Sequence, residues 1–111
     1  MKYFKNIVPY TALNVGEIVS HKGNQIASKS FINNEHTELR FFSYAKGETI
    51  DKEYYEMETM FFIIEGSLKI VYGEQDEIIL HKGQMMALES GIDYGVEALT
   101  DCKAYNILVK S

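Results

Sequence analysis

The strongest constraint on the fold of this chain is a succession of short segments in which apolar and polar residues alternate. Side chains alternate across a β-strand, so a period of two indicates strands. The segment His36 to Ala45 divides its residues between two faces, one with Leu39, Phe41 and Ser43 and the other with Arg40, Phe42 and Tyr44. Similar short segments recur to the end of the chain, and no long window keeps a helical period with caps at its ends. The sequence therefore predicts an all-β protein.

Turn residues separate these segments. Gly73 to Asp76 reads Gly-Glu-Gln-Asp between two strand-like runs, so Ser67 to Lys82 is predicted to form a hairpin. Many short strands divided by glycine-containing turns, with a single proline in the chain, favour a closed or sandwiched antiparallel architecture. At 111 residues the chain is one domain. Met1 to Leu13 is expected to form a short helix or an edge strand.

Charge and composition exclude several classes of partner. The net charge of −5, without a dense cluster of Lys and Arg, argues against binding to nucleic acid. No apolar stretch approaches the length of a membrane span, and the start lacks the apolar core of a signal peptide, so we expect a cytoplasmic protein with no membrane partner. Cys102 is the only cysteine and is expected to be a small buried apolar residue.

The run Met-Phe-Phe-Ile-Ile-Glu-Gly, from Met60 to Gly66, is apolar at successive positions. A strand with one face in water would alternate, so this strand is predicted to be covered on both faces. One cover would be the interior of the domain, and the other a second sheet or a second subunit. A homodimer is therefore expected.

From about Ile26 to Val109 the chain resembles the small single-domain cupin family, of the conserved-barrel type. The first cupin motif runs from a glycine through two histidines and a carboxylate to an apolar stretch that ends in glycine; Gly47, Gly66 and the run before Gly66 match this frame. Gly83 and Gly91 match the glycines of the second motif, and the predicted hairpin separates the two motifs. The resemblance implies a jelly-roll β-barrel over residues 26–111, preceded by an N-terminal segment, residues 1–25, that packs on the barrel or on a dimer partner.

The residues at the cupin ligand positions differ from the family pattern. The first-motif histidines correspond to Glu53 and Tyr55, the carboxylate to Thr59, the proline to Glu89 and the second-motif histidine to Tyr94; Glu58 is a possible substitute carboxylate. Iron, manganese, nickel, copper and zinc in cupins are bound largely by imidazole, which this set lacks. Glu53 and Glu58 are the only candidate metal ligands, and on one straight strand they would point to opposite faces. No cofactor is expected.

If the barrel forms, alternation should point a set of residues inward, and Phe41 on a neighbouring strand is a further candidate. The predicted ligand-binding residues are Glu53, Tyr55, Thr59, Phe61, Ile63, Tyr94 and Phe41. Three functions stay open. The first is a metal-independent module that binds or senses a small organic molecule. The second is a vestigial site filled by its own side chains, in a protein that acts through a dimer surface. The third is an isomerase- or epimerase-like enzyme with Glu53 as general base and Tyr94 as general acid, with or without a weakly bound metal.

Overall fold

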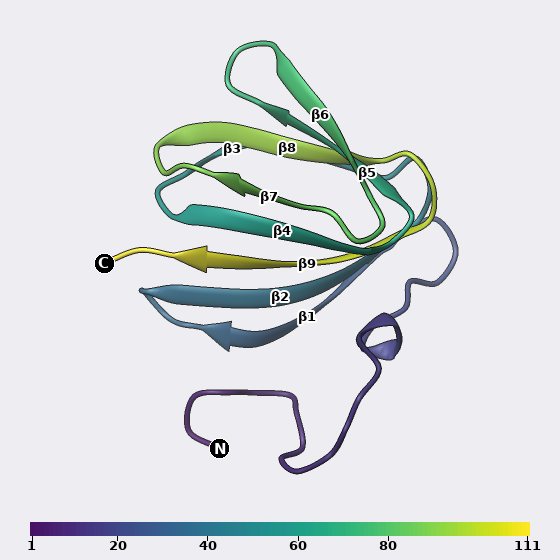
Figure 1. Ribbon diagram of the computed structural model, residues 1–111, viewed down its shortest axis with the longest axis vertical. Coiled ribbons are helices and arrows are strands. Elements are labelled where there is room, and N and C mark those ends of the chain that lie inside the picture. Colours follow the sequence, from purple (N-terminus) through teal and green to yellow (C-terminus); the bar gives the residue numbers. More distant parts are fainter.

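The computed structural model describes all 111 residues, and the strands between Ile26 and Val109 form two facing antiparallel sheets (Figure 1). One sheet has five strands in the order β1-β2-β9-β4-β7, and the other has four in the order β3-β8-β5-β6. The strands are β1 (Ile26–Asn33), β2 (Thr37–Tyr44), β3 (Thr49–Tyr55), β4 (Glu58–Glu65), β5 (Ser67–Tyr72), β6 (Asp76–His81), β7 (Met85–Leu88), β8 (Ile92–Ala98) and β9 (Cys102–Val109). The all-β prediction is confirmed.

The two-residue period decides which side chains fill the space between the sheets. In β4, Thr59, Phe61 and Ile63 are buried, whereas Met60 and Phe62 on the other face are only half-buried. The core cluster draws on both sheets and contains Phe42, Tyr44, Phe61, Ile63, Leu68, Ile70, Leu80, Leu88, Tyr94, Val96, Ala98, Cys102 and Ala104. Local alternation therefore gives each strand one face for the shared core.

The hairpin predicted for Ser67 to Lys82 is confirmed. β5 and β6 pair continuously from Ser67 opposite His81 to Tyr72 opposite Asp76. Gly73 in the connecting turn has φ of 61°, a left-handed conformation in which glycine is favoured because it lacks a Cβ.

The stretch from Gly47 to Gly66 is not one strand. β3 ends at Tyr55 and β4 begins at Glu58, and the two strands belong to different sheets. The straight strand assumed between Glu53 and Glu58 is therefore wrong, because the chain crosses from one sheet to the other between them.

The N-terminal segment forms neither the helix nor the edge strand expected for Met1 to Leu13. Its only regular element is one turn of 3-10 helix, η1 (Val15–Glu17). Figure 1 shows the segment passing outside β1, at the edge of the five-stranded sheet. The Lys5 amide donates a hydrogen bond to the Phe31 carbonyl oxygen at 2.8 Å, so one point of the tail is tied to that edge strand. No helix in the structure is long and apolar enough to cross a membrane.

The outer face of the five-stranded sheet carries a row of aromatic rings. Phe31, Phe41, Tyr105 and Phe62 come from β1, β2, β9 and β4 in turn. Successive ring centroids are 5.2, 4.8 and 4.6 Å apart. This aromatic row accounts for the apolar character of the second face of β4.

Candidate functional site

Side chains from both sheets converge on one internal cavity, which is partly open to solvent because Glu53 in its wall is exposed. On the five-stranded sheet, Arg40, Asn106 and Phe61 are adjacent in register on β2, β9 and β4. On the four-stranded sheet, Glu53 of β3 lies opposite Tyr94 of β8. These five residues are among those that line a cavity of about 180 Å³. The residues that complete its wall are Phe42, Tyr44, Ile50, Tyr55, Gly95 and Val96.

A bulge in β3 places Glu53 in this wall. The register of β3 against β8 shifts between Ile50 and Glu53. Under strict alternation, residues three apart would face opposite sides, but the inserted residue resets the phase so that both line the cavity. Gly95 of β8 allows the bulged backbone to approach, since a Cβ at this position would lie 2.5 Å from the Ile50 carbonyl oxygen.

The two tyrosines are held by each other and by Thr59. The Tyr94 hydroxyl and Thr59 Oγ1 are 2.7 Å apart and share a hydrogen bond. The ring of Tyr55 stacks on that of Tyr94 with centroids 4.1 Å apart, and the Tyr55 hydroxyl donates to Glu53 Oε2 at 3.4 Å. Burial raises the pKa of Tyr94 to about 12, although the hydrogen bond to Thr59 acts in the opposite direction. Burial, followed by the nearby Glu53 carboxylate, raises the pKa of Tyr55. Both phenols are therefore neutral at neutral pH.

The structure brings together four of the seven predicted ligand-binding residues, namely Glu53, Tyr55, Phe61 and Tyr94. Thr59 is buried behind the cavity wall, and Ile63 packs in the core without lining the cavity. Phe41 lies on the outer face, where it stacks on Tyr105, because the alternation that turns Arg40 inward turns its neighbour outward. Glu53 and Tyr94, the pair considered for acid–base chemistry, are direct cross-strand neighbours.

Sequence analysis missed two polar residues of the cavity, Arg40 and Asn106. The two-residue period places Arg40 on the same strand face as Phe42 and Tyr44, but the sequence alone does not show that this face lines a cavity. Arg40 is the only arginine in the chain, and its place on the strand face that carries the aromatic residues Phe42 and Tyr44 is the available signal. Asn106 gave a similar signal, since it alternates with the buried Ala104.

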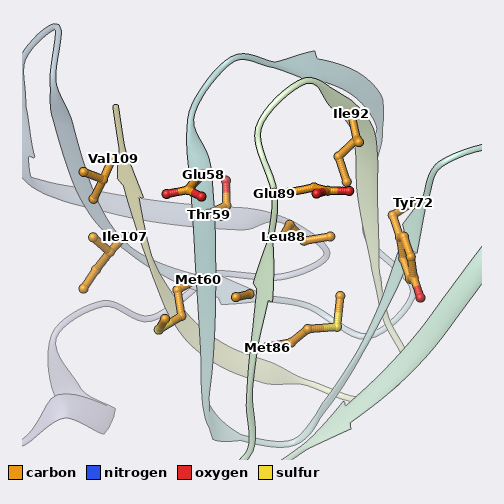
Figure 2. Close-up of a pocket in the computed structure, with 11 residues that line it drawn as sticks. Glu58, Thr59, Met60, Tyr72, Met86, Leu88, Glu89, Ile92, Ile107 and Val109 are labelled. Atoms are coloured by element: carbon orange, nitrogen blue, oxygen red, sulfur yellow. The ribbon is translucent and has the colours of Figure 1, made fainter. Parts of the chain in front are cut away.

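A second hollow, of about 700 Å³, opens beside the short edge strand β7 (Figure 2). Its apolar lining comes largely from Met60, Tyr72, Met86, Leu88, Ile92, Ile107 and Val109. Glu58 and Glu89 line it as well, so Glu58 belongs to a different hollow from Glu53. Thr59 faces this hollow and Tyr94 faces the internal cavity, so their hydrogen bond lies in the partition between the two spaces.

Comparison with solved structures places this architecture among known folds. A conserved protein of unknown function from Streptococcus pyogenes matches with a TM-score of 0.94 and 21% identity, over 100% of this chain and 96% of that one. A cupin superfamily protein from Desulfitobacterium hafniense matches with a TM-score of 0.90 and 19% identity, over 97% of this chain and 98% of that one. The fold is that of a cupin. A cupin 2 conserved barrel domain protein from Leptotrichia buccalis agrees, with a TM-score of 0.87 and 21% identity over 95% of this chain and 50% of that one. No family model and no curated protein matches the sequence.

The cupin fold explains why two separated sequence segments share one cavity. The first motif frame, Gly47 to Gly66, spans β3 and β4, and the second, which begins at Gly83, spans β7 and β8. The β5–β6 hairpin lies between them in the chain, as predicted. Strand pairing within the cupin barrel brings β3 against β8, so Glu53 and Tyr94 meet although they are far apart in the sequence.

Proposed function

We propose that this protein binds a small organic molecule inside its cupin barrel, without a metal ion, and acts as a binding or sensing module. The observation that carries the proposal is an internal cavity with mainly apolar walls and a few convergent polar groups, which is the usual composition of small-molecule sites. Its volume of about 180 Å³ is similar to that of an engineered cavity of about 150 Å³ that admits benzene. A ligand of about the size of a substituted benzene ring therefore fits.

The donor atoms around this cavity do not fit a transition-metal centre. The wall offers one carboxylate, from Glu53, and none of the three histidines of the chain lines it. Iron, nickel, copper and zinc favour imidazole or thiolate ligands, which are missing from this wall. The phenols of Tyr55 and Tyr94 have raised pKa values, and the Tyr94 hydroxyl is already bonded to Thr59. This chemistry supports binding without a metal.

A thermal-shift screen of small metabolites tests the proposal, because a ligand that binds only the folded state raises the melting temperature. We expect a subset of compounds to stabilise the protein. The variant Ile50→Trp should abolish the shift by filling the cavity, whereas Ile78→Trp, at an exposed position on β6 that does not line the cavity, should preserve it. Silence across a broad library would contradict ligand binding. Stoichiometric iron, manganese, nickel, copper or zinc in elemental analysis would contradict metal independence.

A second candidate function is interaction through a homodimer, and exposed apolar side chains favour it. The N-terminal segment exposes a series of them to solvent, namely Met1, Tyr3, Phe4, Val8, Tyr10, Leu13 and Val15. Contiguous exposed apolar surface marks interaction sites. We propose that a second copy of the chain covers this segment together with the half-buried part of the aromatic row, Phe62 and Tyr105.

Light scattering on the full chain tests the dimer. The expected mass is twice the 12.7 kDa of one chain, and the double variant Tyr3→Ser with Tyr10→Ser should shift the population towards the monomer. A monomeric mass for the wild type at micromolar concentration would remove this candidate.

We also propose a cytoplasmic location. Cys102 is buried and free, and an unpaired thiol fits a reducing compartment. Cell fractionation with an antibody to the protein would test the assignment, and recovery outside the cytoplasmic fraction would contradict it.

A further inference from the structure

The wall of the internal cavity contains two polar groups without partners in the protein. Arg40 Nε is buried and has no hydrogen-bond partner. Asn106 is 4% exposed, and its Oδ1 is also buried without a partner. The two residues are directly opposite each other on β2 and β9, and both line the cavity. Buried polar groups without partners are rare and call for an explanation.

The protein supplies no counter-ion for Arg40. The ion pairs of the structure involve other residues, and neither Glu38, two residues earlier on the same strand face, nor Glu53, across the cavity, pairs with the guanidinium. The guanidinium lies over the ring of Phe42, whose centroid is 5.4 Å from Arg40 Cζ. Arg40 as a whole is half-buried and only its Nε is fully enclosed, so part of its charge is desolvated without a counter-ion, which is costly.

A hydrogen bond from Arg40 Nε to Asn106 Oδ1 would satisfy both of these atoms, since the two residues are directly opposite each other in register. Such a bond would fix the guanidinium in the cavity wall but would neutralise no charge. Arginine carries five N–H donors in a planar fork that matches a carboxylate with two parallel hydrogen bonds. An anion is therefore still the missing partner.

We propose that the cavity binds a small monocarboxylate, with its carboxylate on Arg40 and its apolar body against the aromatic and aliphatic wall. This inference rests on the proposed small-molecule function and specifies the ligand class. Phe42, Phe61 and Val96 provide the apolar wall, and the cavity volume of about 180 Å³ limits the body to about one ring or a short chain. Glu53 lines the same cavity, so a second negative charge on the ligand meets repulsion. The site accordingly prefers monocarboxylates to dicarboxylates and phosphate esters.

Benzoate, benzamide and phthalate are suitable probes, since they share a ring and differ in charge. We expect benzoate to bind the wild type at least about tenfold more tightly than benzamide does, because benzamide offers the guanidinium a neutral carbonyl in place of a carboxylate. Phthalate, with a second carboxylate, should bind more weakly than benzoate. Isothermal titration calorimetry at low salt measures all three affinities.

Variants of Arg40 separate its charge from its shape. Arg40→Met should lose the preference for benzoate, and Arg40→Lys should keep part of it, because lysine retains the charge without the fork. The matched control is Lys69→Met, which removes a cation that is paired with Glu97 at 3.0 Å on β5 and does not line the cavity. The control should bind benzoate as the wild type does.

The wild-type protein offers a readout that does not depend on any variant folding. Arg40 is the only arginine, so its Nε–H group gives a single side-chain guanidinium signal in a ¹⁵N NMR spectrum. Benzoate should shift this signal, and benzamide should leave it near its free position. If neutral compounds bind inside the barrel and benzoate does not, the carboxylate inference is overturned while the proposed function stands. If no compound of any charge binds, both are overturned.

Discussion

The hydrogen bond between Thr59 and Tyr94 gives the sharpest test of the interior, because it joins two buried residues from the two different sheets. Thr59 is 2% exposed and Tyr94 is 3% exposed, and their oxygens are 2.7 Å apart. Tyr94→Phe leaves a buried threonine hydroxyl without its partner, and Thr59→Val leaves a phenol without its partner. A buried polar group that loses its partner costs about 1–3 kcal/mol. We expect each single variant to cost about 1–2 kcal/mol, because Thr59 and Tyr94 each border a space that can hold water.

The double variant should cost less than the sum of the two single variants, since it removes both partners and leaves no unpaired group. A coupling free energy of about 1 kcal/mol or more is expected from a bond of this geometry. Urea unfolding followed by far-ultraviolet circular dichroism measures it, with each kcal/mol moving the midpoint by about 0.3–1 M. Tyr72 provides the matched control, because it lines the same hollow as Thr59 without bonding to it, so Tyr72→Phe with Thr59→Val should be additive.

Additive costs for Thr59→Val and Tyr94→Phe, within about 0.5 kcal/mol, would refute the argument. That result would mean that the two hydroxyls do not bond in solution. The Tyr94 hydroxyl would then be free to meet a ligand or a metal, and one support for metal-independent binding would be lost.

Three further outcomes follow from single residues. Gly66→Ala should lower the free energy of unfolding by about 3 kcal/mol or more in urea titrations, because the new Cβ would lie 2.2 Å from the Asp101 carbonyl oxygen. Gly83 has a similar positive φ but open space around it, so Gly83→Ala should cost only about 1–2 kcal/mol. Equal costs for the two variants would contradict the close packing at Gly66. Burial raises the pKa of the Cys102 thiol to about 12. Its reaction with a disulfide reagent at pH 8 should therefore be on the order of a thousandfold slower in the folded protein than in the urea-unfolded protein. Rapid labelling of the folded protein would contradict the burial of this thiol. Burial raises the pKa of Tyr94 from 10.0 in the unfolded chain to about 12 in the folded protein, so the unfolded state loses this proton first as the pH rises. The contribution of Tyr94 to stability is therefore complete below pH 10 and is lost as the pH rises towards 12, at up to about 1.4 kcal/mol per pH unit. Denaturant titrations between these pH values should show a shallower loss of stability for Tyr94→Phe than for the wild type, and an unchanged slope would contradict the shift.

The strand faces were predictable because alternation is a local property of the chain. The inward positions of Phe61 and Ile63 on β4 and the β5–β6 hairpin required only the two-residue period and the turn residues. Phe41 shows the limit of that reasoning. Its strand was predicted correctly, but which of the two faces met the core depended on how β2 pairs with β9.

The site depended more strongly on contacts between distant segments. The bulge between Ile50 and Glu53 reverses the phase of β3, and it is possible only where Gly95 of another strand leaves room. A register shift of this kind moves every later side chain to the other face. The chain crosses from one sheet to the other between Tyr55 and Glu58. Glu53 and Glu58, five positions apart in the sequence, therefore line two different hollows.

The sequence by itself determined that this chain forms short antiparallel strands with one apolar face each, and its resemblance to cupins predicted phenols and a carboxylate at the ligand positions. Only the tertiary structure decided which polar groups find partners. Thr59 and Tyr94 satisfy each other, whereas Arg40 and Asn106 have unpaired polar atoms at the wall of the same cavity. The physical reason is that strand faces follow from neighbours in the chain, while hydrogen-bond partners follow from the register of strands far apart in it.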